Sequence, residues 1–530
     1  MWSKGWRDTV WAQLDRPWDV IVIGGGITGA GIFREAARVG LRVLLVEARD
    51  FGCGTSSRSS KLVHGGLRYL KNAQLKVTME SVGERERLLD EGRGLVQPLG
   101  FVYASFKGDK IPPWVFGAGL AVYDVLGLKW GHKQYDNEGI LHLAPHLTGA
   151  NLKTGFRYFD AQTDDARLTL RVIREGVTGG GVALNYAPVV GLLRQQNGQV
   201  CGVRVRDQAP ANQGRMAEAQ AAVVINATGA WADELRQQVG GSERLRQLRG
   251  SHLVFAAQRF PLTRAISYAH PTDQRPVFAI PWEGVTLFGT TDVDHKAAQL
   301  HDPGMSAAEL DYLLTGLAYA FPELALGAED VVSTFAGIRP VINTGKADPS
   351  KESREHVLWR EAGLLTVAGG KLTTFRVMAH DALNRVRREL PGKPTFRERD
   401  RVLDEPADPG SLADMLQPGM KVRLGGRYGR DLPALLAAAA PAELTFIADS
   451  ISLWAELRWA ARAEGVVHLD DLLLRRVRLG LLLPRGGLDQ MAQIRAIVQP
   501  ELGWDDTRWQ QEEAAYRQLW QQRYYLPNLL

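Results

Sequence analysis

Three features of the sequence predict an α/β fold that combines a parallel-sheet unit, an antiparallel-sheet domain and an all-helical C-terminal domain. Near the N-terminus a buried strand leads into consecutive glycines, and a helical pattern and a second strand follow. Strand-like segments dominate the middle of the chain, which indicates an antiparallel-sheet domain interleaved with the first unit. Beyond residue 419 the pattern is almost entirely helical as far as Tyr525.

The N-terminal unit has the glycine pattern of a Rossmann-like dinucleotide-binding turn. The apolar strand at 20–23 is followed by Gly-Gly-Gly-Ile-Thr-Gly at 24–29, which satisfies G-x-G-x-x-G between a strand and a helix. Gly24 permits the tight turn, Gly26 lets the backbone approach a pyrophosphate, and Gly29 lets the helix pack closely on the sheet. The helix N-terminus then presents unpaired N–H groups and a positive dipole end to the phosphates.

Two further positions indicate which dinucleotide binds. Glu47 ends the second strand, at 42–47, about 20 residues after the glycines, where an acid binds the ribose hydroxyls. An acid there, rather than an arginine, disfavours the 2′-phosphate of NADP. Far downstream, the strand at 222–226 ends in Ala-Thr-Gly at 227–229. Two-domain FAD oxidoreductases use such a turn for a second contact with the flavin dinucleotide, so the two motifs together predict FAD, with Gly229 at the second contact.

The remaining elements set the expected domain boundaries. Residues 50–69 are rich in Gly, Ser and Thr and indicate an ordered loop, and turn-forming Pro-Gly pairs between 403 and 419 interrupt the pattern. We therefore expect an N-terminal extension at 1–18, an FAD-binding domain interleaved with a substrate-binding domain at 19–400, and a helical C-terminal domain at 401–530. Strands are predicted at 182–184, 189–194, 200–206 and 221–226, and near 252–255, 277–280 and 287–290.

Composition excludes several classes of protein. The formal charge of +5 suits an anionic substrate or a negatively charged membrane face, but we find no basic stripe for nucleic acid. Cys53 and Cys201 cannot form a disulfide framework and have no metal-ligand spacing, which predicts a reducing cytosolic location and no metal site. There is no secretory signal, and no apolar run reaches the ~20 residues that span a bilayer. The longest apolar stretch, 114–128, is interrupted by Asp124.

Six segments identify a closer resemblance. They lie at 54–70, 250–252, 280–282, 289–292, 337–340 and 369–376, and they resemble the motifs of the FAD-dependent glycerol-3-phosphate dehydrogenases of the aerobic, membrane-associated type, in that family's order. The helical tail also resembles the family's C-terminal domain, most clearly at 469–483. The resemblance is nearly full length. It implies non-covalent FAD and oxidation of sn-glycerol 3-phosphate to dihydroxyacetone phosphate.

The resemblance also implies a set of site residues whose chemistry suits this substrate. Arginine forks bind phosphate bidentately and lysine acts as a point charge, so the expected phosphate-binding residues are Arg68, Arg354 and Lys371. Tyr69 is a further expected substrate-binding residue. Lys371 follows two glycines at an expected helix start, where it could close on flavin and anion together. The expected cofactor-binding residues, besides Gly24, Gly26, Gly29, Glu47 and Gly229, are Thr55, Ser56, Ser60, Lys61 and Thr373.

The expected chemistry is transfer of the C2 hydrogen as hydride to flavin N5 while a base removes the hydroxyl proton. His252 and Arg339 are the candidates for the hydroxyl contact. Histidine is the more plausible base, because a guanidinium stays charged and can only stabilise an alkoxide. The sequence alone leaves the identity of the base open.

The electron acceptor and the cellular location follow from the family. Its usual acceptor is a membrane quinone, so we expect a cytoplasmic protein attached peripherally to the inner face of the cell membrane, and a homodimer is compatible with the sequence. Residues 114–130 could lie in the membrane interface or pack on their own domain. Three alternatives stay open: a glycerol-3-phosphate oxidase that uses oxygen, an amino-acid or sarcosine-type oxidase, and a non-enzymatic scaffold with an FAD fold.

Overall fold

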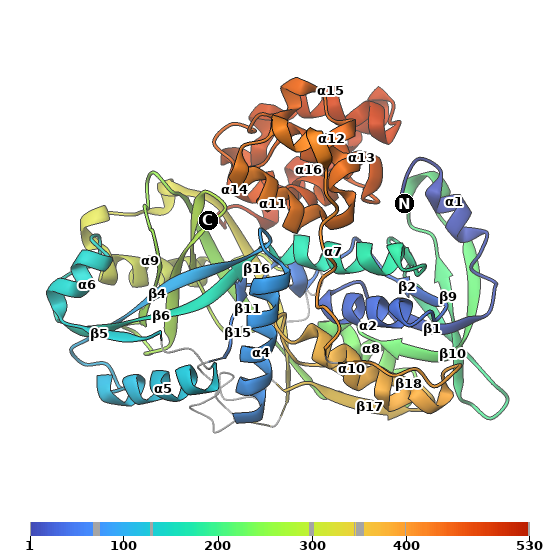
Figure 1. Cartoon of the computed structure of the whole chain (residues 1–530), viewed down its shortest axis with the longest axis horizontal. Coiled ribbons are helices and arrows are strands. Elements are labelled where there is room, and N and C mark those ends of the chain that lie inside the picture. The colour runs from blue at the N-terminus through green and yellow to red at the C-terminus, as the bar shows by residue number, and fades with distance from the viewer. Residues whose placement is uncertain are drawn as a thin grey trace.

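The computed structural model describes residues 2–66, 75–127, 131–295, 302–343, 345, 355–397 and 399–527. Two sheets lie side by side, and a helical domain formed by the end of the chain lies across their junction (Figure 1). The observed class is therefore a Rossmann-like domain interleaved with an antiparallel-sheet domain and followed by a helical domain. This is the predicted fold class.

The first sheet is the parallel one, and β1 lies in its middle. Its strand order is β17-β18-β10-β1-β2-β7, and β1 pairs in parallel with both β10 and β2. All six residues of β1 are buried, as expected for a strand covered on both faces. The strands are β1 (Trp18–Ile23), β2 (Val43–Val46), β7 (Val182–Leu184), β8 (Val189–Arg194), β9 (Val200–Arg206), β10 (Met216–Asn226), β17 (Val357–Glu361) and β18 (Leu364–Ala368).

Helices cover both faces of this sheet. On one face α2 packs between α7 and α10, and its buried Ile27, Ala30 and Phe33 recur at helical spacing. The opposite face is covered by Trp11 and Leu14 at the N-terminus and by the β8–β9 hairpin. The helices are α1 (Trp6–Trp11), α2 (Ile27–Arg38), α7 (Asp165–Thr178), α8 (Ala232–Gln237) and α10 (Phe375–Val386).

The second sheet is almost entirely antiparallel and contains strands that the sequence did not predict. β4, β6 and β16 are among its long strands, and β4 and β16 contain Pro98 and Pro340, which argue against a strand in a sequence pattern. The strands are β3 (Leu62–Val63), β4 (Val96–Phe106), β5 (Lys133–Tyr135), β6 (Leu152–Thr163), β11 (Leu245–Ala256), β12 (Ala265–Ala269), β13 (Pro276–Trp282), β14 (Val285–Gly289), β15 (Val293–Asp294) and β16 (Val331–Ile342). The helices beside it are α4 (Leu75–Glu91), α5 (Pro113–Leu126), α6 (Asn137–Leu143) and α9 (Ala307–Ala320).

The helical domain begins after an irregular linker. Its first helix has Pro418 at its first position, where the missing N–H costs nothing. Its apolar residues, including the segment around Leu472–Leu474 and Leu479, form one core with the inner residues of the second sheet. The elements are α11 (Pro418–Tyr428), α12 (Leu432–Ala438), α13 (Trp454–Ala463), a π-helical turn (Asp471–Arg476), α14 (Leu479–Leu482), α15 (Met491–Leu502) and α16 (Asp506–Arg523).

Candidate active site

A cavity of about 1760 Å³ lies where the two sheets meet. One end is lined by Ile23, Val46 and Ala227, at the carboxyl ends of β1, β2 and β10, which is where nucleotide sites lie in open α/β sheets. The other end is lined by His252 on β11 and Arg339 on β16. The cavity is larger than ordinary small-molecule pockets of roughly 300–1,000 Å³, so it has room for an extended cofactor together with a small substrate.

The glycine turn after β1 is as tight as the motif requires. Gly24 has a φ of +109°, and a Cβ there would lie 2.6 Å from the Ala227 carbonyl oxygen. A Cβ on Gly29 would lie 1.9 Å from the Gly24 carbonyl oxygen, so the first turn of α2 packs directly on the glycine loop. Only glycine fits these two positions, and the N-terminus of α2 faces the cavity through Gly26.

Glu47 and Ser56 hold the glycine loop in place. Oε2 of Glu47 accepts the Gly25 N–H at 2.6 Å, and its Oε1 accepts the Arg49 N–H at 2.9 Å. Oγ of Ser56 accepts the Ile27 N–H at 2.9 Å and so satisfies a first-turn donor of α2. Burial raises the pKa of Glu47, against the opposing effect of these two N–H donors. Both side chains line the cavity and keep lone pairs for a ligand.

These residues fit FAD. The α2 N-terminus and Gly26 offer an anion site for a pyrophosphate, and Glu47 offers a carboxylate for ribose hydroxyls. Thr55 donates to the Ile338 carbonyl oxygen at 2.5 Å and thereby ties the cofactor loop to β16. Gly229, with a φ of +62°, lines the same cavity, as does Thr373. The structure thus brings the two nucleotide motifs to one wall.

His252 is buried against the substrate end of the cavity. Its Nε2 lies 2.9 Å from Oγ of Ser60, and its ring stacks on Phe335 at 4.6 Å. Burial lowers the pKa of His252 well below its ordinary value, and the charges of Arg339 and Lys61 lower it further. The imidazole is therefore neutral near pH 7, which is the form able to accept a proton.

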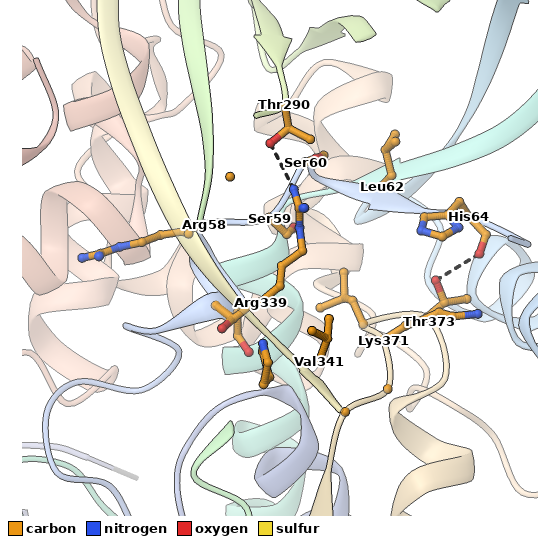
Figure 2. Close-up of a pocket in the computed structure, with 18 of the residues that line it drawn as sticks. Arg58, Ser59, Ser60, Leu62, His64, Thr290, Arg339, Val341, Lys371 and Thr373 are labelled. Atoms are coloured by element: carbon orange, nitrogen blue, oxygen red, sulfur yellow. Dashed lines mark hydrogen bonds between the residues drawn. The ribbon is translucent and has the colours of Figure 1, made fainter. Parts of the chain in front are cut away.

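Arg339 and Lys371 both line the cavity and supply positive charge to it. Arg339 donates to Oδ1 of Asp292 and to Oγ1 of Thr290, each at 3.0 Å, and Figure 2 shows the Thr290 contact beside Ser60. A Cβ on Gly250 would lie 2.4 Å from Nη2 of Arg339, so this glycine leaves room for the guanidinium. Nζ of Lys371 donates to Oγ of Ser81 at 2.9 Å.

Two expectations need correction. Lys61 does not line the cavity with Ser60: it is fully buried, and its ammonium donates to Asp165 at 2.9 Å and to the Ser57 carbonyl oxygen at 2.8 Å. Its φ of +61° lies in the left-handed region, so the backbone bends at this residue. Lys371 does not begin a helix either. α10 starts at Phe375, because positive φ angles at the two preceding glycines place Lys371 in a loop. The predicted Arg68, Tyr69 and Arg354 lie outside the described residues.

Several lining residues were missed by the sequence analysis. Thr290 and Asp292 belong to the motif at 289–292, which could have identified them, but no function was predicted for either residue. Asp160 on β6 carried no such signal. It accepts the Gly65 N–H and a guanidinium hydrogen of Arg85, both at 3.1 Å, and burial raises its pKa to about 6, against the effect of Arg85. Arg58 also lines the cavity, although its side chain extends away from Arg339 and Thr290 (Figure 2).

Part of the cavity lining is apolar and comes largely from α5 and the residues next to it. It includes Ile111, Val115, Phe116, Val122 and Phe278. On the outer side of α5, Trp114 is 75% exposed and Val125 is 63% exposed, while Leu120 and Tyr123 pack inward.

In the described part of the chain, no helix has the length and apolar character to cross a bilayer, and no group of three or more His, Cys, Asp or Glu residues could hold a metal ion.

Comparison with known families agrees with this geometry. Residues 19–376 match a family described as FAD dependent oxidoreductase, and residues 409–509 match the C-terminal domain of alpha-glycerophosphate oxidase. Because the first match covers more than half of the chain, the fold and the cavity are those of an FAD-dependent oxidoreductase, and FAD is its cofactor.

Individual proteins narrow the assignment. Glycerol-3-phosphate dehydrogenase 2 of Mycobacterium tuberculosis is 37% identical, over 96% of this chain and 89% of that protein. The aerobic glycerol-3-phosphate dehydrogenase of Bacillus subtilis is 40% identical, over 72% and 69%. The FAD-bound structure of glycerol-3-phosphate dehydrogenase from Bacillus halodurans superposes with a TM-score of 0.81 at 28% identity and covers 100% of this chain and 99% of that one. The chain belongs to the FAD-dependent glycerol-3-phosphate dehydrogenase family.

Proposed function

We propose that this enzyme oxidises sn-glycerol 3-phosphate to dihydroxyacetone phosphate and passes the electrons to a membrane quinone. The observation that carries the proposal is one cavity in which the FAD-binding loops face His252, Arg339 and Lys371. A neutral imidazole and two cations suit a secondary alcohol that carries a dianionic phosphate. The names of the relatives above point to the same substrate.

The roles of the residues follow from their contacts. Lys371, with Arg68 and Arg354, would bind the phosphate, Tyr69 would be a further substrate contact, and Lys371 is already oriented by Ser81. Arg339 would lie at the C2 oxygen and stabilise its developing negative charge. Asp292 and Thr290 hold the Arg339 guanidinium, so little reorganisation is needed when substrate binds.

His252 is the proposed base that accepts the proton of the substrate C2 hydroxyl. When FAD is bound it supplies the acceptor for the two electrons and the hydrogen that leave C2. The hydroxyl proton would pass to the imidazole, whose orientation Ser60 and Phe335 fix from two sides. The burial that lowers the pKa of His252 keeps its imidazole neutral, so the ring is in the form that can accept a proton when substrate is bound.

The proposed quinone acceptor is supported by the apolar part of the cavity lining at α5. A small polar substrate has no use for Val115, Phe116 and Phe278, whereas a lipid-soluble quinone would bind such a surface. The exposed Trp114 and Val125 on the same helix could enter the headgroup region of a membrane. Peripheral attachment at the inner face of the cell membrane belongs to the same proposal.

The direct test is the visible spectrum of the purified holoenzyme under anaerobic conditions. We expect sn-glycerol 3-phosphate to bleach the flavin bands, because the reducing half-reaction needs no external acceptor. Bands that persist with this compound but bleach with an amino acid would instead identify an amino-acid oxidase.

Oxygen is the second candidate acceptor, because the helical domain matches that of an alpha-glycerophosphate oxidase. The two acceptors are separated by reoxidising the bleached enzyme with air or with a short-chain quinone. We expect fast reoxidation by quinone and slow formation of peroxide. Stoichiometric peroxide at a rate equal to turnover would favour the oxidase.

A further inference from the structure

One short segment of the helical domain, which we call the arginine segment (475–478), contacts the loops behind the flavin site. The π-helical turn Asp471–Arg476 leads into it, and the Val477 N–H donates to the Leu472 carbonyl oxygen five residues earlier, at 3.0 Å. Such turns are rare and recur at functional sites. Its three arginines, Arg475, Arg476 and Arg478, are all buried, and all three bind residues of the loop that follows β2 or its neighbours.

Asp50 is the main target of the arginine segment. Arg476 donates to both carboxylate oxygens of Asp50, at 2.6 and 2.8 Å, and Arg475 donates to one of them. Asp50 has no exposed surface. Burial raises the pKa of this carboxyl, but the charges of Arg476 and Arg475 outweigh it and hold the pKa low. Asp50 is therefore a carboxylate fixed by a guanidinium fork from a different part of the chain.

Asp50 lies in the loop that shapes the FAD-binding turn. Three residues before it, Glu47 binds the Gly25 N–H, and two residues after it, the Gly52 N–H donates to the Gly25 carbonyl oxygen at 2.9 Å. Both backbone polar groups of Gly25, its N–H and its C=O, are thus paired with this loop. A shift of Asp50 would move Glu47 and Gly52, and the glycine turn with them.

Arg478 contacts the cofactor loop at a second point. Its Nη2 donates to the Ser57 carbonyl oxygen at 2.9 Å, directly after Thr55 and Ser56, which line the cavity. Ser56 in turn binds the first turn of α2. Figure 1 shows the helical domain lying over the junction of the two sheets, above α7.

We propose that the arginine segment is the positioning element of the FAD site, with the Arg476–Asp50 pair at its centre. The helical domain thereby holds the loop at 47–57 in the conformation that retains the cofactor. None of the three arginines lines the cavity, so the effect passes through Asp50 and Ser57 to the residues that do. The inference depends on FAD as the cofactor and is independent of the substrate proposed above.

The test is the rate at which the full-length holoenzyme releases FAD after dilution, followed by the rise in flavin fluorescence. Arg476→Lys keeps the charge but loses the two-pronged contact with Asp50. We expect its FAD release to be roughly tenfold faster or more, because changes at a binding site act mainly on dissociation. Asp50→Asn, which keeps the shape of the side chain, should behave in the same way.

A matched control separates this role from ordinary stabilisation. Arg423 forms buried ion pairs with Glu456 of the helical domain and with Glu283 of the antiparallel-sheet domain, each at 3.0 Å, and neither partner belongs to the cofactor loop. Arg423→Lys should lower the melting temperature as much as Arg476→Lys does and release FAD at the unsubstituted rate. Equal release rates from the Arg476→Lys and unsubstituted enzymes, or equally fast release from Arg423→Lys, would overturn the proposal. If Arg476→Lys does not fold, Asp50→Asn decides, and normal FAD release from it would overturn the proposal.

Discussion

At the scale of single residues, the site depends on side chains whose orientations are fixed by contacts with their neighbours. His252 is fixed between the Ser60 hydroxyl and the Phe335 ring, and Arg339 is fixed by Asp292 and Thr290. Behind them, Glu309 accepts the hydroxyls of Ser251 and Thr291 at 2.9 and 2.7 Å. The motifs at 250–252 and 289–292 are therefore tied together by one buried carboxylate.

Lys371→Ala tests the phosphate assignment. Loss of the ammonium should reduce kcat/KM for sn-glycerol 3-phosphate, because a charge-assisted contact in a partly buried site is lost. The corresponding loss of transition-state stabilisation is about 2 kcal/mol or more. Steady-state kinetics with unchanged FAD content checks this. Ser81→Ala is the control, since it removes only the hydroxyl that orients Lys371 and should cost less. Kinetics unaltered by Lys371→Ala would show that the residue has been misassigned.

The pH dependence of kcat/KM tests His252. Because its pKa is lowered, the imidazole stays neutral to a lower pH than an ordinary histidine. Activity should fall only as the pH drops below ~6.5, the ordinary pKa of the side chain. His252→Gln should lower kcat roughly 100-fold or more and remove this acid limb from the residual activity. An acid limb that remains in the variant would assign it to another group.

At the scale of elements, α5 combines two roles on two faces. Leu120 and Tyr123 are buried on its inner face. Val115 and Val122 line the cavity but are also 41% and 45% exposed, and Trp114 and Val125 are more exposed still. A helix with an exposed apolar face beside a cavity suits an acceptor that arrives from a membrane.

Replacing Trp114 and Val125 with serine tests this role. Each substitution removes up to about 1.5–3 kcal/mol of the free energy gained by burying an apolar side chain in a membrane, so vesicle binding should weaken by roughly tenfold or more. Quinone reduction should slow equally, while anaerobic bleaching by substrate stays unchanged. The control is Val190→Ser with Met216→Ser, two residues on other elements that are 42% and 48% exposed. Equal loss of vesicle binding in both pairs would contradict a membrane role for α5.

At the scale of the whole molecule, buried ion pairs join the helical domain to the sheet domains. Asp164, at the start of α7, accepts from Arg427 at 2.9 Å, and Arg167 binds Glu464 at 2.6 Å. The N-terminal extension is also attached, since Trp2 stacks on Phe51 at 5.0 Å and is buried. We propose the divisions 1–18, 19–400 and 401–530 as domains that unfold as one unit.

Acid titration tests this coupling. Burial raises the pKa of Asp164, but the charges of Arg478 and Arg427 lower it to about 2. A carboxyl with a lowered pKa in the folded state stabilises the fold above its unfolded pKa, and this contribution is lost as the pH falls from about 4 to 2. Asp164→Asn should remove at least about 2 kcal/mol of the free energy of unfolding at pH 7 and flatten its decline in acid.

Chemical denaturation at several pH values measures this effect. Asp294→Asn is the control, because that carboxylate is 58% exposed in its pair with Arg246 and should contribute less than about 1 kcal/mol. Two separate unfolding transitions in the unsubstituted enzyme would contradict unfolding as one unit.

Much of the fold could be predicted from local sequence. The strand at 20–23, the glycine turn and the helix after it have patterns that need no distant partner, and β1 and α2 lie where they were expected. β4 and β16 could not be predicted, because each contains a proline, which argues against a strand in a local pattern. Both strands are stabilised by pairing with distant strands, β4 with β6 and β16 with β11. Among the site residues, Lys61 shares a motif with Ser60, but packing turned it toward Asp165.

The sequence by itself determined the family, the cofactor and the class of the fold, because glycine turns and cofactor motifs are made by residues close together in the chain. The tertiary structure decided what lies around the reacting groups. Ser60 meets His252 across 192 residues, and Arg476 meets Asp50 across 426. Such contacts are set by how the sheets and helices pack, and no local pattern records which distant side chain completes a buried hydrogen bond.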